Sequence, residues 1–193
     1  MFANKLASRI CIAVTVLLGG CATLDKINAP SLSGSPTTSA LVVVKSEAVM
    51  HGMLGLKTPQ QVEGGVLLST DGSKRVEGRA VAGLIIFSDV APGEYNLARI
   101  QTTWRAGNMV WQHTYNVPPE KALNFVISVK VGEPKYLGVV TIEEIRKTTE
   151  RGVIFELKPS KEGEDTAWEK FTQLYQGSPW ASEVQKRMAE PKQ

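Results

Sequence analysis

The segment FSDVAPGEYNLARI, residues 87–100, decides how the chain is expected to fold, because two strand-forming stretches flank one tight turn. Pro92 fixes φ at the second position of a β-turn, and Gly93 accepts the positive φ that a type II turn requires next. Strand, turn and strand in close succession are typical of an antiparallel β-hairpin. The segment therefore predicts a domain built from antiparallel strands.

The same pattern continues on both sides of this segment. Turn residues such as Asp71-Gly72 and Gly107-Asn108 separate runs that are rich in β-branched and aromatic residues. These runs cover residues 40–45, 64–70, 82–90, 95–104, 108–117, 122–131, 135–145 and 151–159. Helical crossovers are missing between them, which argues against a parallel sheet. We expect a mainly β fold, an antiparallel β-sandwich or small barrel of about seven to eight strands.

Alternation within the runs predicts which side chains are buried. In NMVWQHTYNV, residues 108–117, the face that carries Trp111, His113 and Tyr115 is the expected core side. Residues 84–87 are apolar on both faces, which predicts a central strand covered on both sides. Residues 49–65 lack this alternation and are expected to form a long loop or an irregular edge.

The C-terminal segment, residues 161–193, has a helical pattern. Thr166 and Glu169 have the spacing of a capping box, which predicts a helix over about 167–176. One face of this helix carries Trp168, Phe171, Leu174 and Tyr175. Ser178-Pro179 is expected to cap and start a second short helical segment. We expect the apolar face to pack on the β-domain rather than on a partner or a membrane surface, because a basic polar face is lacking.

The N-terminus, residues 1–20, predicts a cleaved signal peptide. Lys5 and Arg9 precede an apolar run of about nine residues, roughly half of the ~20 that a bilayer-spanning helix needs. The sequence then changes from LLGGC, residues 17–21, to a polar segment rich in Ser, Thr, Pro and Gly. Residues 21–39 are expected to be a flexible tether, and residues 40–160 the β-domain.

Leu18, Gly19, Gly20 and Cys21 resemble the lipobox of bacterial lipoproteins. The resemblance implies that a signal peptidase recognises the first three residues and that lipidated Cys21, carrying palmitate-like chains, becomes the first residue of the mature protein. Ala22 follows, where such lipoproteins carry Asp for inner-membrane retention. The implied location is the outer membrane, with the domain facing the periplasm and surface exposure left open.

Residues 87–100 also resemble one hairpin of the carboxypeptidase regulatory-like, or transthyretin-like, β-sandwich. The resemblance rests on Phe87, Val90, Pro92, Gly93 and Tyr95. The whole arrangement of lipobox, small β-domain and short C-terminal helix is similar to a group of small bacterial lipoproteins of undefined function.

Composition and motifs argue against several function classes. The 22 basic and 19 acidic residues leave the chain nearly neutral, without the basic stripe of a nucleic-acid partner. Only one cysteine remains after cleavage, so no internal disulfide forms. Glu143 and Glu144 are adjacent on a strand and point to opposite faces, which does not suit an acid and base pair. Without a catalytic, phosphate-binding or zinc signature, we expect a non-enzyme that needs no cofactor or metal.

Three functions stay open on the sequence alone. The first is a lipid-anchored binding or structural module that acts on another envelope protein or component. The second is a periplasmic hydrolase or metal-dependent enzyme in which the fold brings His51 and His113 together beside an acid such as Asp89. The third is glycan or peptidoglycan binding through Trp104 and Trp111, which flank the turn at Gly107. Glycan binding requires the two tryptophan rings to be exposed; if they are buried, they belong to the hydrophobic core instead.

Overall fold

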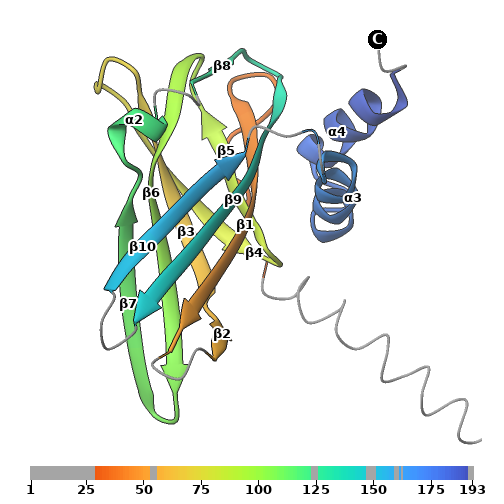
Figure 1. Cartoon of the computed structure of the whole chain (residues 1–193). Helices are drawn as coiled ribbons and strands as arrows, with labels where there is room; N and C mark the ends of the chain where they lie inside the picture. The colour runs from red at the N-terminus through yellow and green to blue at the C-terminus, as the bar shows by residue number, and fades with distance from the viewer. Residues whose placement is uncertain are drawn as a thin grey trace, which may run out of the picture.

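The computed structural model describes residues 29–52, 56–122, 126–146, 151–158, 161 and 163–190. Ten strands in this part of the chain form one sheet that curls into a half-barrel, and two short helices stand beside it (Figure 1). None of the described helices has the length and apolar composition needed to cross a lipid bilayer. Cys21 and residues 18–20 lie outside the described residues.

The element bounds follow the expected runs with several extensions. The strands are β1 (Ala40–His51), β2 (Lys57–Pro59), β3 (Gln61–Ser69), β4 (Arg75–Val81), β5 (Leu84–Val90), β6 (Gly93–Ala106), β7 (Met109–Asn116), β8 (Ile127–Val129), β9 (Pro134–Arg146) and β10 (Arg151–Lys158). The helices are α2 (Pro119–Ala122), α3 (Glu164–Leu174) and α4 (Pro179–Ala189). The expected count of seven to eight strands is too low, because β4 alternates charged residues with small or apolar ones and β2 and β8 are only three residues long. The expected strand at 122–131 is reduced to β8.

The strand order is β10-β9-β1-β5-β4-β3-β6-β7, with β2 also paired to β1 and β8 to β6. The strands make one curled sheet rather than two clearly separate layers, which corrects the expected sandwich in favour of a barrel-like form. One pair is parallel: β1 runs beside β9 from the Leu41–Pro134 pair to the His51–Ile145 pair. The argument against parallel strands was wrong here because the intervening strands themselves make the crossover.

The expected hairpin around Pro92 and Gly93 is also wrong. β5 pairs with β1 and β4, whereas β6 pairs with β3, β7 and β8, so the two strands that flank this turn are not neighbours. Both sides of β5 are already occupied, and the chain therefore crosses to another wall of the half-barrel at this point. Gly93 has φ 152° and begins β6.

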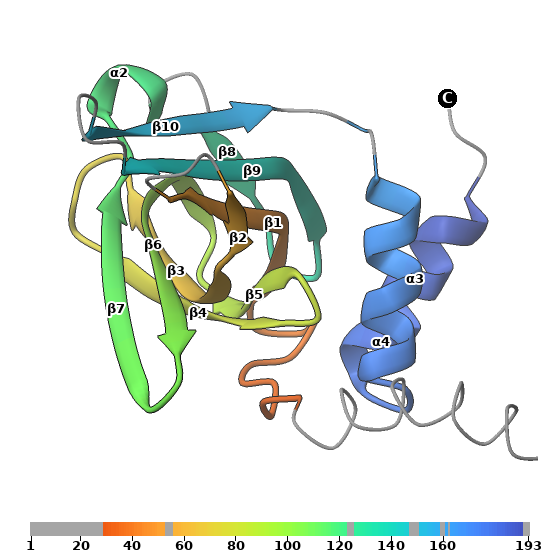
Figure 2. The same ribbon diagram turned by 60° about the horizontal axis from the view of Figure 1, so that its bottom comes forward.

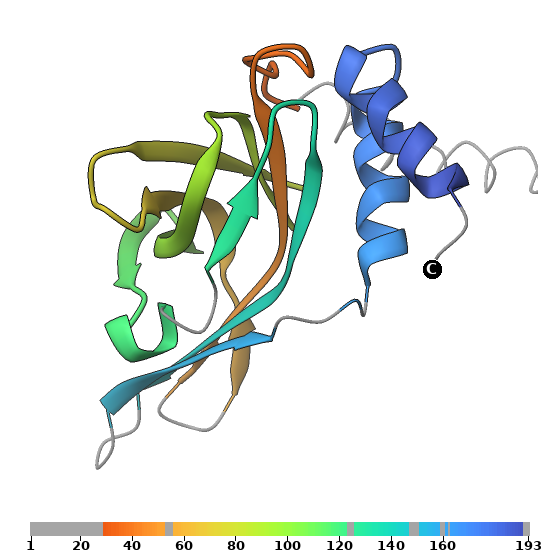
Figure 3. The same cartoon turned by 90° about the horizontal axis from the view of Figure 1, so that it is seen from above.

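The core has two parts, one inside the curl and one outside it. Inward side chains of β1 and β5, such as Val42 and Phe87, join the inner cluster, while Leu41 and Ile86 point outward. The outer cluster is completed by α3 and α4, which lie together on one side of the half-barrel (Figures 2 and 3). This confirms that β5 is a central strand covered on both sides and that the helices pack on the sheet.

Of the two helix starts predicted from local sequence, the one at Ser178 is confirmed and the one at Thr166 is wrong. The Ser178 Oγ accepts a hydrogen bond from the Ala181 N–H at 3.1 Å, with Pro179 in the first turn, as expected. The capping box of Thr166 does not form, because α3 already begins at Glu164 after a left-handed Gly163. Negative charge near this helix N-terminus is favourable without a side-chain cap.

The end of the expected tether contacts the domain. The Ser33 N–H donates to the Ser88 Oγ at 3.0 Å, and Leu32 packs against the outer cluster. Ser39 is buried. Contact with the domain thus begins before β1, and residues 21–28 of the expected tether lie outside the described part of the chain.

A glycine pair allows the sheet to curl tightly around a phenylalanine ring. Gly65 of β3 and Gly78 of β4 are register partners, and the fully buried Phe87 ring of β5 lies against both. A Cβ atom at Gly78 would lie 2.6 Å from two atoms of that ring. Glycine inside a strand often marks such a close approach or a bend at a barrel corner.

We predict that Gly78→Ala lowers the free energy of unfolding by about 2–3 kcal/mol, because the methyl group forces the Phe87 ring from its place. Gly152→Ala is the matched control, since a Cβ at this strand glycine has no neighbour within 4 Å. We expect that control to change stability by less than about 0.5 kcal/mol. Urea unfolding measures both variants, and equal losses would contradict the role of the glycine pair.

Candidate functional site

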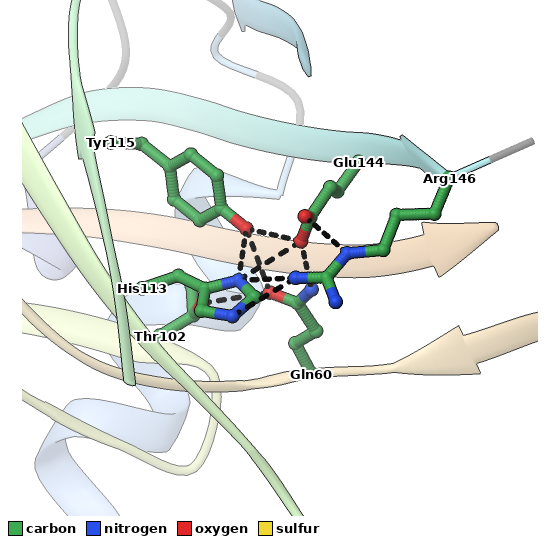
Figure 4. A network of polar contacts seen from close by, with 6 residues as sticks. All are labelled: Gln60, Thr102, His113, Tyr115, Glu144 and Arg146. Atoms are coloured by element: carbon green, nitrogen blue, oxygen red, sulfur yellow. Dashed lines mark hydrogen bonds and ion pairs between the residues drawn. The ribbon is translucent and has the colours of Figure 1, made fainter. Parts of the chain in front are cut away.

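Six polar side chains meet inside the half-barrel near the end where β1, β6 and β9 point (Figure 4). They are Gln60, Thr102, His113, Tyr115, Glu144 and Arg146. Glu144 and Arg146 follow Ile142 of the inner cluster at two-residue spacing, which places them on the inward face of β9. The network joins β7, one end of the strand order, to β9 near the other end.

The Glu144 carboxylate is the centre of this network, and only 13% of its side chain is exposed. Its Oε2 accepts hydrogen bonds from the Tyr115 hydroxyl at 2.8 Å and the Gln60 amide at 3.0 Å. Its Oε1 accepts from the Arg146 Nε at 2.6 Å. Burial by itself would raise the pKa of Glu144, but the hydrogen bonds from Arg146, Tyr115 and Gln60 lower that pKa to about 2. The carboxylate is therefore ionised at neutral pH.

Gln60 and Tyr115 are each held so that they donate a hydrogen bond to the Glu144 carboxylate. The buried Thr102 hydroxyl donates to the Gln60 Oε1 at 2.7 Å, which turns the amide nitrogen toward Glu144. Burial, with a contribution from the hydrogen bond to Glu144, raises the pKa of Tyr115 to about 12. Gln60 and Thr102 were not expected from the sequence, because these two residues are 42 positions apart and match no motif.

His113 completes the network beside the carboxylate. Its Nδ1 lies 3.0 Å from the Glu144 Oε2, and an ionised carboxylate only accepts, so Nδ1 carries a hydrogen. One nitrogen of Arg146 lies 3.1 Å from Nε2 and 3.4 Å from Nδ1. Because Nδ1 carries the hydrogen, Nε2 is free to accept a hydrogen bond from this Arg146 nitrogen. In the described part of the chain, no hydroxyl or thiol is hydrogen-bonded to the His113 Nε2.

The two histidines do not share a site, so the arrangement that the hydrolase alternative required is not found. The His51 Nε2 lies 3.2 Å from the Glu143 Oε2, whereas His113 contacts Glu144. These two carboxylates point to opposite faces of β9, as expected from their adjacency. Asp89 is exposed on β5 and is not part of the network. Among the described residues, no group of three His, Cys, Asp or Glu side chains is placed to hold a metal ion.

Trp104 and Trp111 are register partners on β6 and β7, next to the pair formed by Thr102 and His113. Their rings stack on each other, with centroids 4.5 Å apart and planes at 27°. Both residues are half-buried, so they are neither core nor freely exposed. Because β3 pairs with β6 only as far as Thr103, this ribbon extends beyond its neighbour and the stacked pair stabilises it. Glycan contact through these rings stays a prediction.

A groove of about 760 Å³ opens in the wall of the half-barrel beside the network. It lies where β3 and β4 separate: they pair from Gly64 onward, while Gln61 and Val62 pair only with β6 among the described strands and Glu63 lies at an irregularity of that ladder. Residues 46–49, 59–63 and 80–83 line it. Gln60 belongs to both the groove and the polar network.

The groove carries negative charge. Its lining includes Glu47 and Glu63 but no lysine, arginine or histidine. Glu47 lies 3.2 Å from the Lys45 ammonium group, while the exposed Glu63 carboxylate has no ion pair or hydrogen bond among the described residues. Sequence reasoning missed this site because its walls meet only through the strand order.

Comparisons with known proteins name no relative: no protein-family model matches the chain, and no curated protein and no solved structure matches it. The functional argument therefore depends on the geometry described above.

We predict that Glu144→Gln lowers the free energy of unfolding at pH 7 by about 2–3 kcal/mol, because it removes the charge that four neighbours are arranged to hold. A carboxyl with a lowered pKa stabilises the folded state above its ordinary value of 4.5, and this contribution is lost as pH falls toward 2. The difference between wild type and variant should therefore shrink between pH 4.5 and pH 2.

Urea unfolding at several pH values measures this effect, and Glu143→Gln is the matched control. Glu143 lies on the opposite face and is more exposed, so its loss should cost less than about 1 kcal/mol. A pH-independent difference for Glu144→Gln would contradict the ionised state of the network.

Proposed function

We propose that this protein is a lipid-anchored cell-envelope module that binds a segment of another envelope component in the groove between β1, β3 and the β4–β5 turn. One observation carries the proposal: a large open concavity lies between strands that have separated, whereas the six polar side chains next to it bond to one another. Extended segments commonly bind proteins at such unpaired strand margins.

The network itself supports binding rather than catalysis. A general acid or base works best when its pKa lies near the operating pH. The pKa of Glu144 is lowered to about 2 and that of Tyr115 is raised to about 12, so each keeps a single protonation state at neutral pH. The hydrolase alternative that needed two histidines in one site loses its geometry. The network instead fixes Gln60 in the groove wall.

The envelope location is part of the proposal and comes from the sequence. The lipobox-like residues 18–21 support lipidation of Cys21, and the absence of Asp at position 22 supports the outer membrane. Several long acyl chains on one residue hold a protein on a bilayer far more firmly than one chain does. The resemblance of residues 87–100 to the carboxypeptidase regulatory-like family enters the proposal on sequence alone, because the two strands of this segment do not pair as a hairpin and the sheet is a half-barrel.

We predict that Cys21→Ala abolishes incorporation of labelled palmitate and moves the protein from the membrane to the soluble fraction. Cys11→Ala is the matched control, because Cys11 lies in the expected signal peptide and should leave labelling unchanged. Loss of label in the Cys11 variant alone, or membrane retention of the Cys21 variant, would contradict the anchor.

The binding proposal is tested by photo-crosslinking in intact envelopes. A photoreactive phenylalanine replaces the exposed Gln61 in the groove, and Gln173 on the exposed side of α3 serves as control. We expect one discrete adduct at Gln61, absent at Gln173 and weakened when Cys21→Ala releases the protein from the membrane. Absence of an adduct at Gln61, or the same adducts at both positions, would overturn the proposal.

A further inference from the structure

We infer that the groove binds an extended peptide that adds a strand beside β3 and places a lysine or arginine against Glu63. This inference rests on the proposed function, because it names the ligand of the same groove. It is carried by the backbone arrangement of the walls and by their charge.

The backbone of the walls supplies unused hydrogen-bonding groups. Among the described residues, Gln61 and Val62 of β3 have a strand neighbour only on the β6 side, while Glu63 lies at an irregularity of that ladder. Because consecutive residues of a strand turn their N–H and C=O groups to opposite sides, one of Gln61 and Val62 turns both groups toward the groove. Backbone polar groups require partners, and an added strand provides them in regular order.

The far wall limits the groove without filling it. Ala80 and Val81 of β4 pair only with β5, and the turn that follows reaches β1 through the Gly83 carbonyl, which accepts from the Ser46 N–H at 2.9 Å. On the near side, the Gln60 N–H donates to the Ala48 carbonyl at 2.8 Å. These two bonds hold both sides of the opening against β1.

Charge selects the kind of peptide. Glu63 is exposed at the groove and has no ion pair with any residue that the structure describes, and Glu47 on the β1 wall forms an ion pair with Lys45. No basic residue lines the groove to neutralise an acidic ligand. An acidic segment would therefore meet repulsion from both walls, whereas a lysine or arginine of an extended segment gains an ion pair with Glu63.

The first test is selection of ten-residue peptides from a random displayed library on the full chain, purified in detergent. We expect wild type to enrich peptides in which one position is lysine or arginine at about threefold or more its library frequency. Glu63→Lys should lose this preference and favour acidic residues. Glu94→Lys, an exposed change on β6 away from the groove lining, should keep the wild-type preference.

The second test asks whether the peptide binds as a strand. N-methylation of alternate peptide bonds in a selected peptide should weaken binding about tenfold in one register and little in the other, because only one register bonds to β3. Amide exchange of residues 61–63 should slow when the peptide is bound.

The outcomes separate this inference from the proposed function. Identical selected sequences for wild type and Glu63→Lys, no enrichment at all, or equal effects of both N-methylation registers would overturn the inference. If the adduct at Gln61 is still found in envelopes, the groove remains the binding site for a ligand of other chemistry. If the adduct is absent, the proposed function fails as well.

Discussion

The ionised Glu144 carboxylate is the interaction on which the half-barrel depends. It receives hydrogen bonds from Gln60 beside β3, Tyr115 on β7 and Arg146 on β9, so one side chain joins three walls. β7 and β9 are far apart in the strand order, and the described ladders do not pair them. The curl is therefore held at this end by side-chain bonds to a charge. A buried charge without these donors would be costly, which makes the carboxylate and its donors mutually dependent.

The same network gives the groove its fixed shape. Gln60 is bound on both sides: its backbone N–H donates to the Ala48 carbonyl and its side chain lies between Thr102 and Glu144. A wall residue held at its backbone N–H and at both polar atoms of its side chain loses little freedom when a ligand arrives, and such preorganisation favours affinity. Gln60 therefore belongs both to the network that stabilises the interior and to the wall of the proposed binding groove.

Local patterns predicted the local structure well and the long-range structure poorly. Alternation placed Tyr115 inward, and apolar residues on both faces marked β5 as central, because each signal reflects the burial of the segment itself. The turn at Pro92 and Gly93 wrongly predicted a hairpin. A turn motif shows that the chain changes direction, but it does not show which strands pair with each other. The parallel β1–β9 ladder and the meeting of Gln60 with Glu144 depend on strand order, which no short window of sequence contains.

The parallel ladder also sets the order in which the chain can assemble. Leu41 pairs with Pro134, a residue 93 positions later, since 134 − 41 = 93. Closing a loop of this length precedes any gain from the contact, and topologies dominated by such contacts fold slowly. β1 is made early but receives its β9 neighbour only after most of the domain has been synthesised. Until then its apolar edge is open to wrong pairing, so the unfinished chain is exposed to aggregation for most of its synthesis.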